Sequence, residues 1–283
     1  SMPRDGGNLI LSETDLTDLK NTDPQAERFI KSYCGAKEFI EGTPRYCLWI
    51  TDTQTQEAEE SPWISRRLRA VSEYRQDSDT SPSTAKYADR PHLFVQRAYK
   101  PTNSIIIPRH SSERRKYVPI GYLGPDTVIS DAANAVYDAE PWLFALLTSR
   151  MHMAWLGTVG GKLETRYRYS NTLVYNNFPV PPLTDQVKEA LTQRAFRVLD
   201  VREYHCEYTL AELYDAENMP ENLRQAHADL DVVVDRIYRK RPFDSDDERL
   251  SLLFSLYQQM TAEEATVPQP TSATKRTRRS RKA

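Results

Sequence analysis

A proline-rich segment, Phe178-Pro179-Val180-Pro181-Pro182, divides this chain of 283 residues into two parts with different hydrophobic periodicity. The part before it contains short runs rich in β-branched and aromatic residues, which favour strands, at residues 45–50, 93–99, 104–108, 117–123 and 127–130. The part after it has apolar residues at helical spacing, at residues 187–201, 220–237 and 245–257. We therefore expect an α+β fold, in which a mixed α/β domain with short strands precedes a small all-α helical domain.

Helix signals also occur within the first part. Residues 61–74 begin with Ser-Pro, and serine caps helix N-termini while proline fits the first turn, so a helix is predicted there. Ser12 followed by Asp15, and the pair Asp23-Pro24, predict two earlier helix starts. Residues 141–156 are apolar on nearly every side, which indicates one buried helix.

The change of pattern predicts three segments. Residues 1–184 form the mixed domain and residues 185–262 the helical domain. Residues 263–283 form a basic tail, rich in Thr, Pro and Ser, that is expected to be disordered. The first two residues, Ser1-Met2, are interpreted as a cloning remnant before an internal fragment.

Composition indicates a protein of the reducing cytoplasm. The three cysteines, Cys34, Cys47 and Cys206, have no close spacing, which argues against a disulfide framework and against a zinc site. No apolar run approaches the roughly 20 residues needed to span a bilayer. We therefore expect a cytoplasmic protein with no membrane contact and no bound metal.

Charge is distributed unevenly along the chain, although the formal net charge is only −2. Acidic residues exceed basic ones in residues 1–60 and 185–262, whereas basic residues exceed acidic ones in residues 61–184 and in the tail. A basic middle between acidic flanks is the pattern expected when one face of a protein meets a polyanion.

No catalytic motif is found in the sequence. The chain lacks a glycine-rich phosphate loop, a GxSxG elbow and an HExxH motif. His205-Cys206-Glu207 lacks the second ligand pair of a zinc site, so an exposed helix end is favoured. His152 lies within the apolar segment and is expected to be a hydrogen-bonded core histidine. We expect this chain by itself to be non-catalytic and to carry no cofactor.

The segment from Arg109 to Tyr117 is a candidate contact for nucleic acid. It is a short link between two predicted strands, and such links lie on the surface. Hydroxyl and cationic side chains that can bind phosphates are concentrated in it, namely Ser111, Ser112, Arg114, Arg115 and Lys116. A solvated basic loop with no ligand explains the same pattern, and the sequence leaves both interpretations open.

A more specific candidate is the segment 162–170. If this segment is extended, Glu164, Arg166 and Arg168 share one face. Arginine pairs bidentately with guanine O6 and N7, and glutamate accepts from cytosine N4, so this face suits the reading of base edges. The alternative is a self-paired surface ladder of Glu and Arg, which contributes little free energy.

These segments resemble the C-terminal part of the MmeI-like, type IIL restriction-modification enzymes. The resemblance covers nearly the whole chain, from about residue 6 to about residue 260. It is carried by residues 6–12, 37–40 with 45–49, 108–121, 148–155, 167–170 with 175–179, and 213–215 with 219–220 and 223–224.

The resemblance implies a longer parent chain with an endonuclease segment, an adenine-N6 methyltransferase that uses S-adenosylmethionine, a target-recognition domain and a C-terminal helical domain. Residues 1–184 would be the target-recognition domain. It would select the site in double-stranded DNA for methylation by the methyltransferase domain of the same parent chain, and for Mg²⁺-dependent cleavage if a nuclease is present. The resemblance marks Glu164 and Arg166 as a pair that varies with the base recognised. It adds further base-reading positions at Arg168, Arg109, Asp131 and Ala132.

Two other functions remain open from the sequence. A stand-alone DNA hydrolase could use Glu164 and Asp131, and cleavage of DNA by the pure protein with Mg²⁺ would support it. A protein-interaction scaffold could use the acidic helical domain. DNA binding that is absent or insensitive to salt would favour this scaffold, because phosphate contacts weaken steeply as salt rises.

Exchange of the charged pair, Glu164→Lys with Arg166→Asp in the parent enzyme, is expected to change the preferred base at one position of the recognition sequence. The reason is that the exchanged side chains offer opposite charges to a base edge. Mapping of methylated sites in genomic DNA measures this change. An unchanged motif would remove both residues from base reading.

Overall fold

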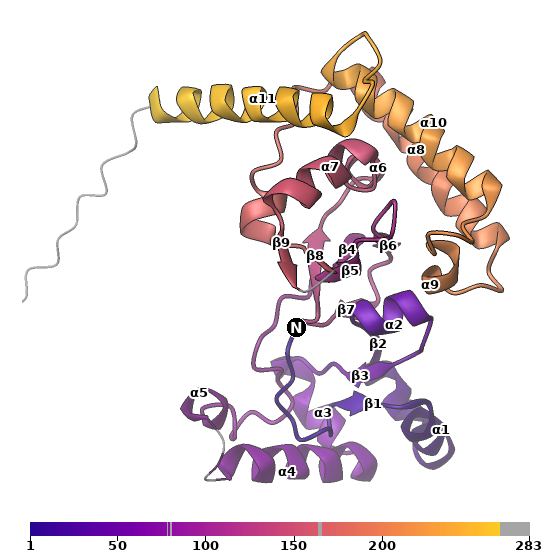
Figure 1. Ribbon diagram of the computed structural model, residues 1–283. Coiled ribbons are helices and arrows are strands. Elements are labelled where there is room, and N and C mark those ends of the chain that lie inside the picture. The colour runs from indigo at the N-terminus through magenta and orange to yellow at the C-terminus, as the bar shows by residue number, and fades with distance from the viewer. Residues whose placement is uncertain (78, 80, 164–165, 267–283) are drawn as a thin grey trace, which may run out of the picture.

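The computed structural model describes residues 1–77, 79, 81–163 and 166–266 of the chain (Figure 1). Glu164 and residues 267–283 of the predicted tail therefore lie outside the described residues. In the described part, helices and short strands alternate up to Tyr175, and helices alone follow from Asp185. The predicted α+β class, with a mixed domain followed by helices, is confirmed.

The N-terminal sheet has the strand order β1-β3-β2-β7. Its strands are β1 (Ile10–Leu11), β2 (Ile30–Cys34), β3 (Tyr46–Leu48) and β7 (Thr127–Ile129). Strand β3 pairs antiparallel with β1 and β2, whereas β7 lies parallel to β2. Because β7 comes from much later in the chain, this sheet ties the N-terminal segment to the middle of the molecule.

Short helices surround this sheet, namely α1 (Glu13–Thr22), η1 (Pro24–Phe29), α2 (Ala36–Glu41), η2 (Asp52–Gln54), α3 (Thr55–Glu59), α4 (Pro62–Gln76) and α5 (Pro82–Ala85). Ser12 and Asp15 form a capping box at α1, and Ser61 caps α4, as the sequence predicts. The start predicted at Asp23-Pro24 is a 3₁₀ helix without a side-chain cap. Helix α4 runs along the lower edge of the view in Figure 1.

Arg75 of α4 is fully buried and holds the neighbouring segments together. Its guanidinium donates hydrogen bonds of 2.7–3.1 Å to the backbone carbonyls of Pro3, Arg4, Tyr87, Arg90 and Leu93. A guanidinium has five N–H donors in a fixed fork, so every donor of Arg75 has an acceptor. Burial lowers the pKa of Arg75, and the nearby Asp5 carboxylate acts in the opposite direction.

Two further sheets are joined directly at Arg109. One has the order β6-β4-β8, with β4 (Ser104–Pro108), β6 (Gly121–Leu123) and β8 (Ala133–Tyr137). The other has the order β5-β10-β9, with β5 (His110–Ser112), β9 (Gly161–Leu163) and β10 (Arg166–Arg168). All neighbouring strands in both sheets are antiparallel. Since Arg109 alone separates β4 from β5, it connects the two sheets.

Two strand predictions need correction. Residues 93–99 contain only an isolated bridge to Met2, and the carbonyl of Leu93 accepts from a buried guanidinium instead of a partner strand. The strand expected from Tyr117 begins only at Gly121 as β6. Pro119 explains the delay, because proline lacks the N–H group that a strand ladder requires.

The apolar segment predicted as one helix is broken into α6 (Pro141–Leu147) and α7 (Arg150–Val159). Ser149 accounts for the break. Its hydroxyl accepts from the backbone N–H of His152 and donates to the carbonyl of Leu146 at 2.7 Å. A serine that bonds neighbouring backbone groups in this way competes with the continuing helix.

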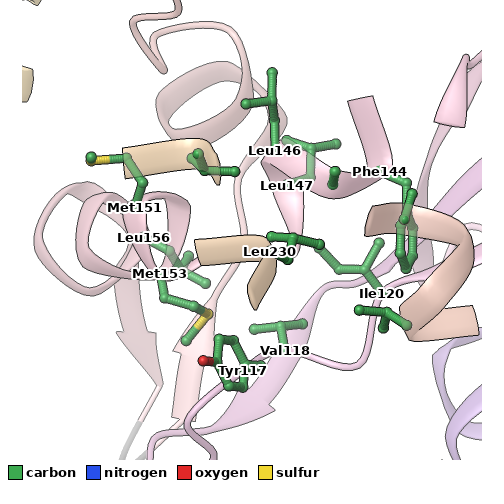
Figure 2. Packing of buried hydrophobic residues seen from close by; sticks show 14 of the residues in the cluster. Tyr117, Val118, Ile120, Phe144, Leu146, Leu147, Met151, Met153, Leu156 and Leu230 are labelled. Carbon is green, nitrogen blue, oxygen red and sulfur yellow. The ribbon is translucent and has the colours of Figure 1, made fainter. Parts of the chain in front are cut away.

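The remaining helices are the π-helix η3 (Asn171–Tyr175) followed by α8 (Asp185–Tyr204), α9 (Leu210–Leu213), α10 (Glu221–Tyr238) and α11 (Asp246–Thr266). Helices α8 and α10 lie side by side, α8 also packs on α6, and α11 packs on α7 (Figure 1). One hydrophobic core, called the shared core below, therefore contains residues from both sides of the boundary predicted at residue 184. Figure 2 shows Leu230 of α10 among Phe144, Leu147 and Val118.

Replacement of Arg75 by methionine is expected to lower the free energy of unfolding by on the order of 3 kcal/mol, because it leaves buried carbonyls without donors. Urea unfolding followed by circular dichroism measures the change. Arg69→Met, at an exposed position of the same helix, is the matched control and should cost less than about 0.5 kcal/mol. Equal effects of the two variants would contradict the structural role of Arg75.

Candidate nucleic-acid interface

Strand β10 lies in the middle of the sheet β5-β10-β9 and presents Arg166 and Arg168 on one face. Both arginines are exposed, whereas Tyr167 between them is partly buried and packs against the shared core. The alternation follows from the strand period of two, which sends successive side chains to opposite faces. The structure therefore places these two arginines together on the outer face of the sheet.

Strand β5 supplies further residues of this face. His110 lies opposite Arg168, and Ser112 lies opposite Arg166, so their side chains point outward as well. Ser111 is buried. The expectation that Ser111 lies on the surface is corrected, because strand alternation turns its hydroxyl inward.

The segment 162–170 is not one extended strand. Strand β9 pairs antiparallel with β10, with Leu163 opposite Arg166, so the chain reverses direction between these two residues. Of the face predicted for Glu164, Arg166 and Arg168, the described residues therefore include only the two arginines, both on β10. Glu164 itself lies outside the described residues.

Arg109 connects the outer face of β10 to the end of the sheet β6-β4-β8. Pro108 at the end of β4 pairs with Ala133 at the start of β8, so the next residue, Arg109, lies near Ala132. Ala132 is exposed, and its neighbour Asp131 is half-buried. The carbonyl of Arg109 accepts a hydrogen bond of 2.8 Å from the N–H of Tyr169. The structure thus brings Arg109, Asp131 and Ala132 to the same corner as Arg168.

A groove of about 610 Å³ lies at this corner. Its lining includes Arg109, His110, Asn134, Arg168, Asn171 and Leu173. Within the described residues, the guanidinium groups of Arg109 and Arg168 have no hydrogen-bond or ion-pair partner. The sequence alone did not predict Asn134, Asn171 and Leu173 as site residues, because no charge run or periodicity marks them. The groove therefore offers arginines without partners among the described residues next to neutral hydrogen-bonding groups.

The basic loop, which consists of residues 113–117 after β5, faces acidic residues of the helical domain. Arg114 forms an ion pair with Glu217 at 3.4 Å, and both side chains are exposed. Burial lowers the pKa of Arg115, and the nearby Asp215 carboxylate counteracts this shift. Lys116 is exposed. Exposed ion pairs contribute about 0–1 kcal/mol, so Arg114 can exchange its carboxylate partner for a phosphate at small cost.

Tyr117, at the end of the basic loop, is anchored to the helical domain through Asp231 of α10. The hydroxyl of Tyr117 donates to Oδ2 of Asp231, and the backbone N–H of Arg150 donates to Oδ1, both at 2.7 Å. Burial raises the pKa of Asp231 to about 6, although both hydrogen bonds act in the opposite direction. Ion pairs of two arginines lie next to this carboxyl, namely Arg150–Asp246 and Arg249–Asp235.

A second buried network crosses the same boundary. The ring of His227 on α10 stacks on Tyr117, with ring centroids 4.1 Å apart. The hydroxyl of Tyr214 lies 2.7 Å from Nε2 of His227 and accepts hydrogen bonds from Arg202. Arg202 also donates to the carbonyl of Ile120 at 2.6 Å. These contacts fix the helical domain against the segment that carries the basic loop.

The histidines noted in the sequence have partners within the protein. His152 is buried with Nε2 2.9 Å from the hydroxyl of Tyr169, and burial lowers its pKa to about 3. His205 lies 2.9 Å from Oδ1 of Asn222. Across the described part of the chain, no group of three or more His, Cys, Asp or Glu could hold a metal ion. In the same part, no helix is long and apolar enough to cross a bilayer.

The structure consists of a mixed α/β domain with a cationic outer face and a helical domain fixed to it. This arrangement is that of a recognition domain supported by a C-terminal domain. The family model described as "MmeI, target recognition domain" matches residues 1–182, and the model "MmeI, C-terminal domain" matches residues 183–264. The chain therefore belongs to the MmeI family.

Two relatives agree with this membership. DNA methyltransferase A of Bacillus subtilis (strain 168) is 42% identical over 261 residues, which cover 92% of this chain and 30% of the relative. A structure of the type IIL restriction-modification enzyme MmeI in complex with DNA is similar with a TM-score of 0.85 at 34% identity. That similarity covers 92% of this chain and 35% of the other. The chain thus spans about a third of the length of these relatives.

The contribution of Asp231 to stability is expected to depend on pH. A carboxyl whose pKa is raised from 3.8 to about 6 by folding stabilises fully below pH 3.8 and loses this contribution as pH rises towards 6. The stability advantage of the wild type over Asp231→Asn should therefore shrink by about 1 kcal/mol between about pH 5 and about pH 7.5. Urea unfolding at the two pH values measures it.

Asp200→Asn, at an exposed position of α8, is the matched control for this measurement. It is expected to change the free energy of unfolding by less than about 0.5 kcal/mol at both pH values. An advantage of the wild type over Asp231→Asn that grows with pH would contradict the burial of an ionisable carboxyl at this junction.

Proposed function

We propose that this chain is the sequence-specific DNA recognition module of a type II restriction-modification enzyme. The proposal rests on the observation that Arg109 and Arg168 line one groove. Neither arginine has a partner among the described residues. Guanidinium groups pair bidentately with guanine O6 and N7, which the major groove displays. Membership of the MmeI family and similarity to a structure of MmeI in complex with DNA support the same function.

Direct base reading is assigned to Arg109, Asp131, Ala132 and Arg168 at this corner and to Arg166 on the same face of β10. The arginines present donors to guanine, and the Asp131 carboxylate presents an acceptor for cytosine N4. Ala132 is exposed and offers an apolar contact. Glu164 is included through the family resemblance alone, as the partner of Arg166 in reading one base pair.

Contacts with the DNA backbone are assigned to Ser112 at the end of β5 and to Arg114, Arg115 and Lys116 in the loop that follows. Phosphate contacts set the position of the protein on the duplex without reading its sequence. Arg114 would exchange Glu217 for a phosphate when DNA binds. Ser111 is left out of this set because its side chain is buried.

The helical domain is proposed to brace the recognition surface rather than to cover the DNA. Acidic residues exceed basic ones in this domain, and a polyanion is repelled by such a surface. Its contacts through Asp231 and His227 end at Tyr117, the last residue of the basic loop. The domain would therefore hold the loop in position for the phosphates.

Catalysis is proposed to belong to parts of a longer enzyme outside this chain, which spans about a third of its relatives. A methyltransferase domain of the same parent chain, using S-adenosylmethionine, would methylate N6 of an adenine flipped out of the duplex. Mg²⁺ would be required if the parent also cleaves DNA. No residue of this chain is given a role towards either group. Because such an enzyme acts on DNA inside the cell, we place it in the cytoplasm.

Arg168→Ala is expected to relax specificity at one position of the recognised sequence by about tenfold or more. The reason is that one bidentate contact with a base contributes about 1–3 kcal/mol of discrimination. Enrichment of randomised DNA duplexes by the 283-residue chain, followed by sequencing, measures this change.

Arg197→Ala, which removes an exposed cation from α8, is the matched control and should enrich the wild-type motif. The proposed function fails if the wild-type chain enriches no motif. It also fails if DNA binding does not weaken between about 50 and about 200 mM salt, since phosphate contacts release counterions. That second result would favour an interaction scaffold.

A further inference from the structure

The groove at the corner continues onto the π-helix η3, which begins two residues after the end of β10. Leu173 of η3 is 55% exposed. It lines the same groove as Arg109 and Arg168. A single exposed leucine is common on protein surfaces, so its place in a cationic groove, rather than its exposure, makes it a candidate contact for a ligand.

Hydrogen bonds on both sides of Leu173 hold it in place. Ser170 Oγ accepts from the backbone N–H of Leu173 at 3.2 Å, and Asn177 Nδ2 donates to its carbonyl at 3.3 Å. The next residue, Val174, is fully buried, and its carbonyl accepts from Trp155 Nε1 at 3.1 Å. Leu173 is therefore presented by a fixed turn, so little conformational entropy is lost when a ligand covers it.

The chemistry of the groove restricts what can cover this leucine. The occupant must offer hydrogen-bond acceptors to the guanidinium groups of Arg109 and Arg168 and an apolar group to Leu173 beside them. The major groove of DNA meets both requirements within neighbouring base pairs, since guanine displays O6 and N7 and thymine displays its C5-methyl group. Charge complementarity also favours a polyanion here, because both arginines lack partners among the described residues.

We propose that Leu173 is a further specificity-determining residue, which contacts the C5-methyl group of a thymine next to the base pair read by Arg168. The inference rests on the proposed function of the chain in DNA recognition. Leu173 would add an apolar contact with a base to a surface whose other assigned contacts are mainly hydrogen bonds and ion pairs. Thymine is distinguished from cytosine at this position by its methyl group as well as by its O4 acceptor.

The test uses the duplex motif enriched by the wild-type chain. Each thymine of that motif is replaced in turn by deoxyuridine, which lacks only the C5-methyl group, and affinities are measured for the 283-residue chain. At one thymine next to the base pair whose selection depends on Arg168, the wild type should lose affinity about fourfold. This factor corresponds to about 0.8 kcal/mol for one buried methyl group.

Leu173→Ala should bind the thymine duplex about fourfold more weakly than the wild type and should bind the deoxyuridine duplex with no further loss. Val232→Ala, which truncates a half-exposed aliphatic side chain on α10, is the matched control and should keep wild-type affinity and methyl sensitivity. Leu173→Gln, which keeps the length of the side chain, should lose the methyl sensitivity as well. Equal unfolding midpoints of the variants show that the fold is retained.

Three results overturn the inference. The first is a motif without a methyl-sensitive thymine next to the Arg168-dependent base pair. The second is a Leu173→Ala variant with wild-type affinity, and the third is a variant with weaker affinity but unchanged sensitivity to deoxyuridine. The proposed function stands in all three cases. A wild-type chain that enriches no motif overturns the proposed function itself, and the inference with it.

Discussion

The antiparallel pairing of β10 with β5 is the interaction on which the candidate interface depends. Its register decides which side chains face outward, and a shift by one residue would bring Tyr167 to the surface in place of both neighbouring arginines. The register is specified from the interior. Tyr167 packs against the shared core, and the hydroxyl of the buried Tyr169 lies 2.9 Å from Nε2 of His152. Buried aromatic packing therefore sets the position of the exposed arginines.

The shared core extends this constraint to the whole C-terminal part. Residues matched by two family domains, 1–182 and 183–264, contribute to one hydrophobic core and to the hydrogen bonds around Asp231. Separation of the two parts would expose apolar surface and leave buried polar groups without partners, and both changes are costly. The recognition surface and the helical domain are therefore expected to move as one body. Such rigidity favours discrimination between bases, because misplaced donors cannot adapt to a wrong base edge.

Local signals in the sequence predicted the elements whose partners lie nearby in the chain. Capping residues located α1 and α4, and helical periodicity located α8 and α10. Most of the failures share a physical cause, since they depend on a partner that is distant in sequence or on a competing local bond. The late start of β6 has a separate cause, which is the missing N–H group of Pro119. The inward direction of Ser111 follows only from its pairing with β10, and the Arg114–Glu217 ion pair joins residues 103 positions apart. The same reason explains why Asn134 and Leu173 were missed, because only the folded chain brings them to one groove.

The cations of the candidate interface fall into two physical groups. Arg114 in the loop has a carboxylate partner, and an exposed pair of this kind yields to a phosphate at small cost. Among the described residues, Arg109 and Arg168 at the corner have no such partner, so their planar donor forks are available to a ligand. In the proposed function, a loop that exchanges partners would follow phosphates whose positions vary with the DNA sequence, whereas a fixed guanidinium would test for guanine at one position. Base pairs that offer no guanine to an arginine require neutral contacts, and the groove supplies these at Asn134, Asn171 and Leu173.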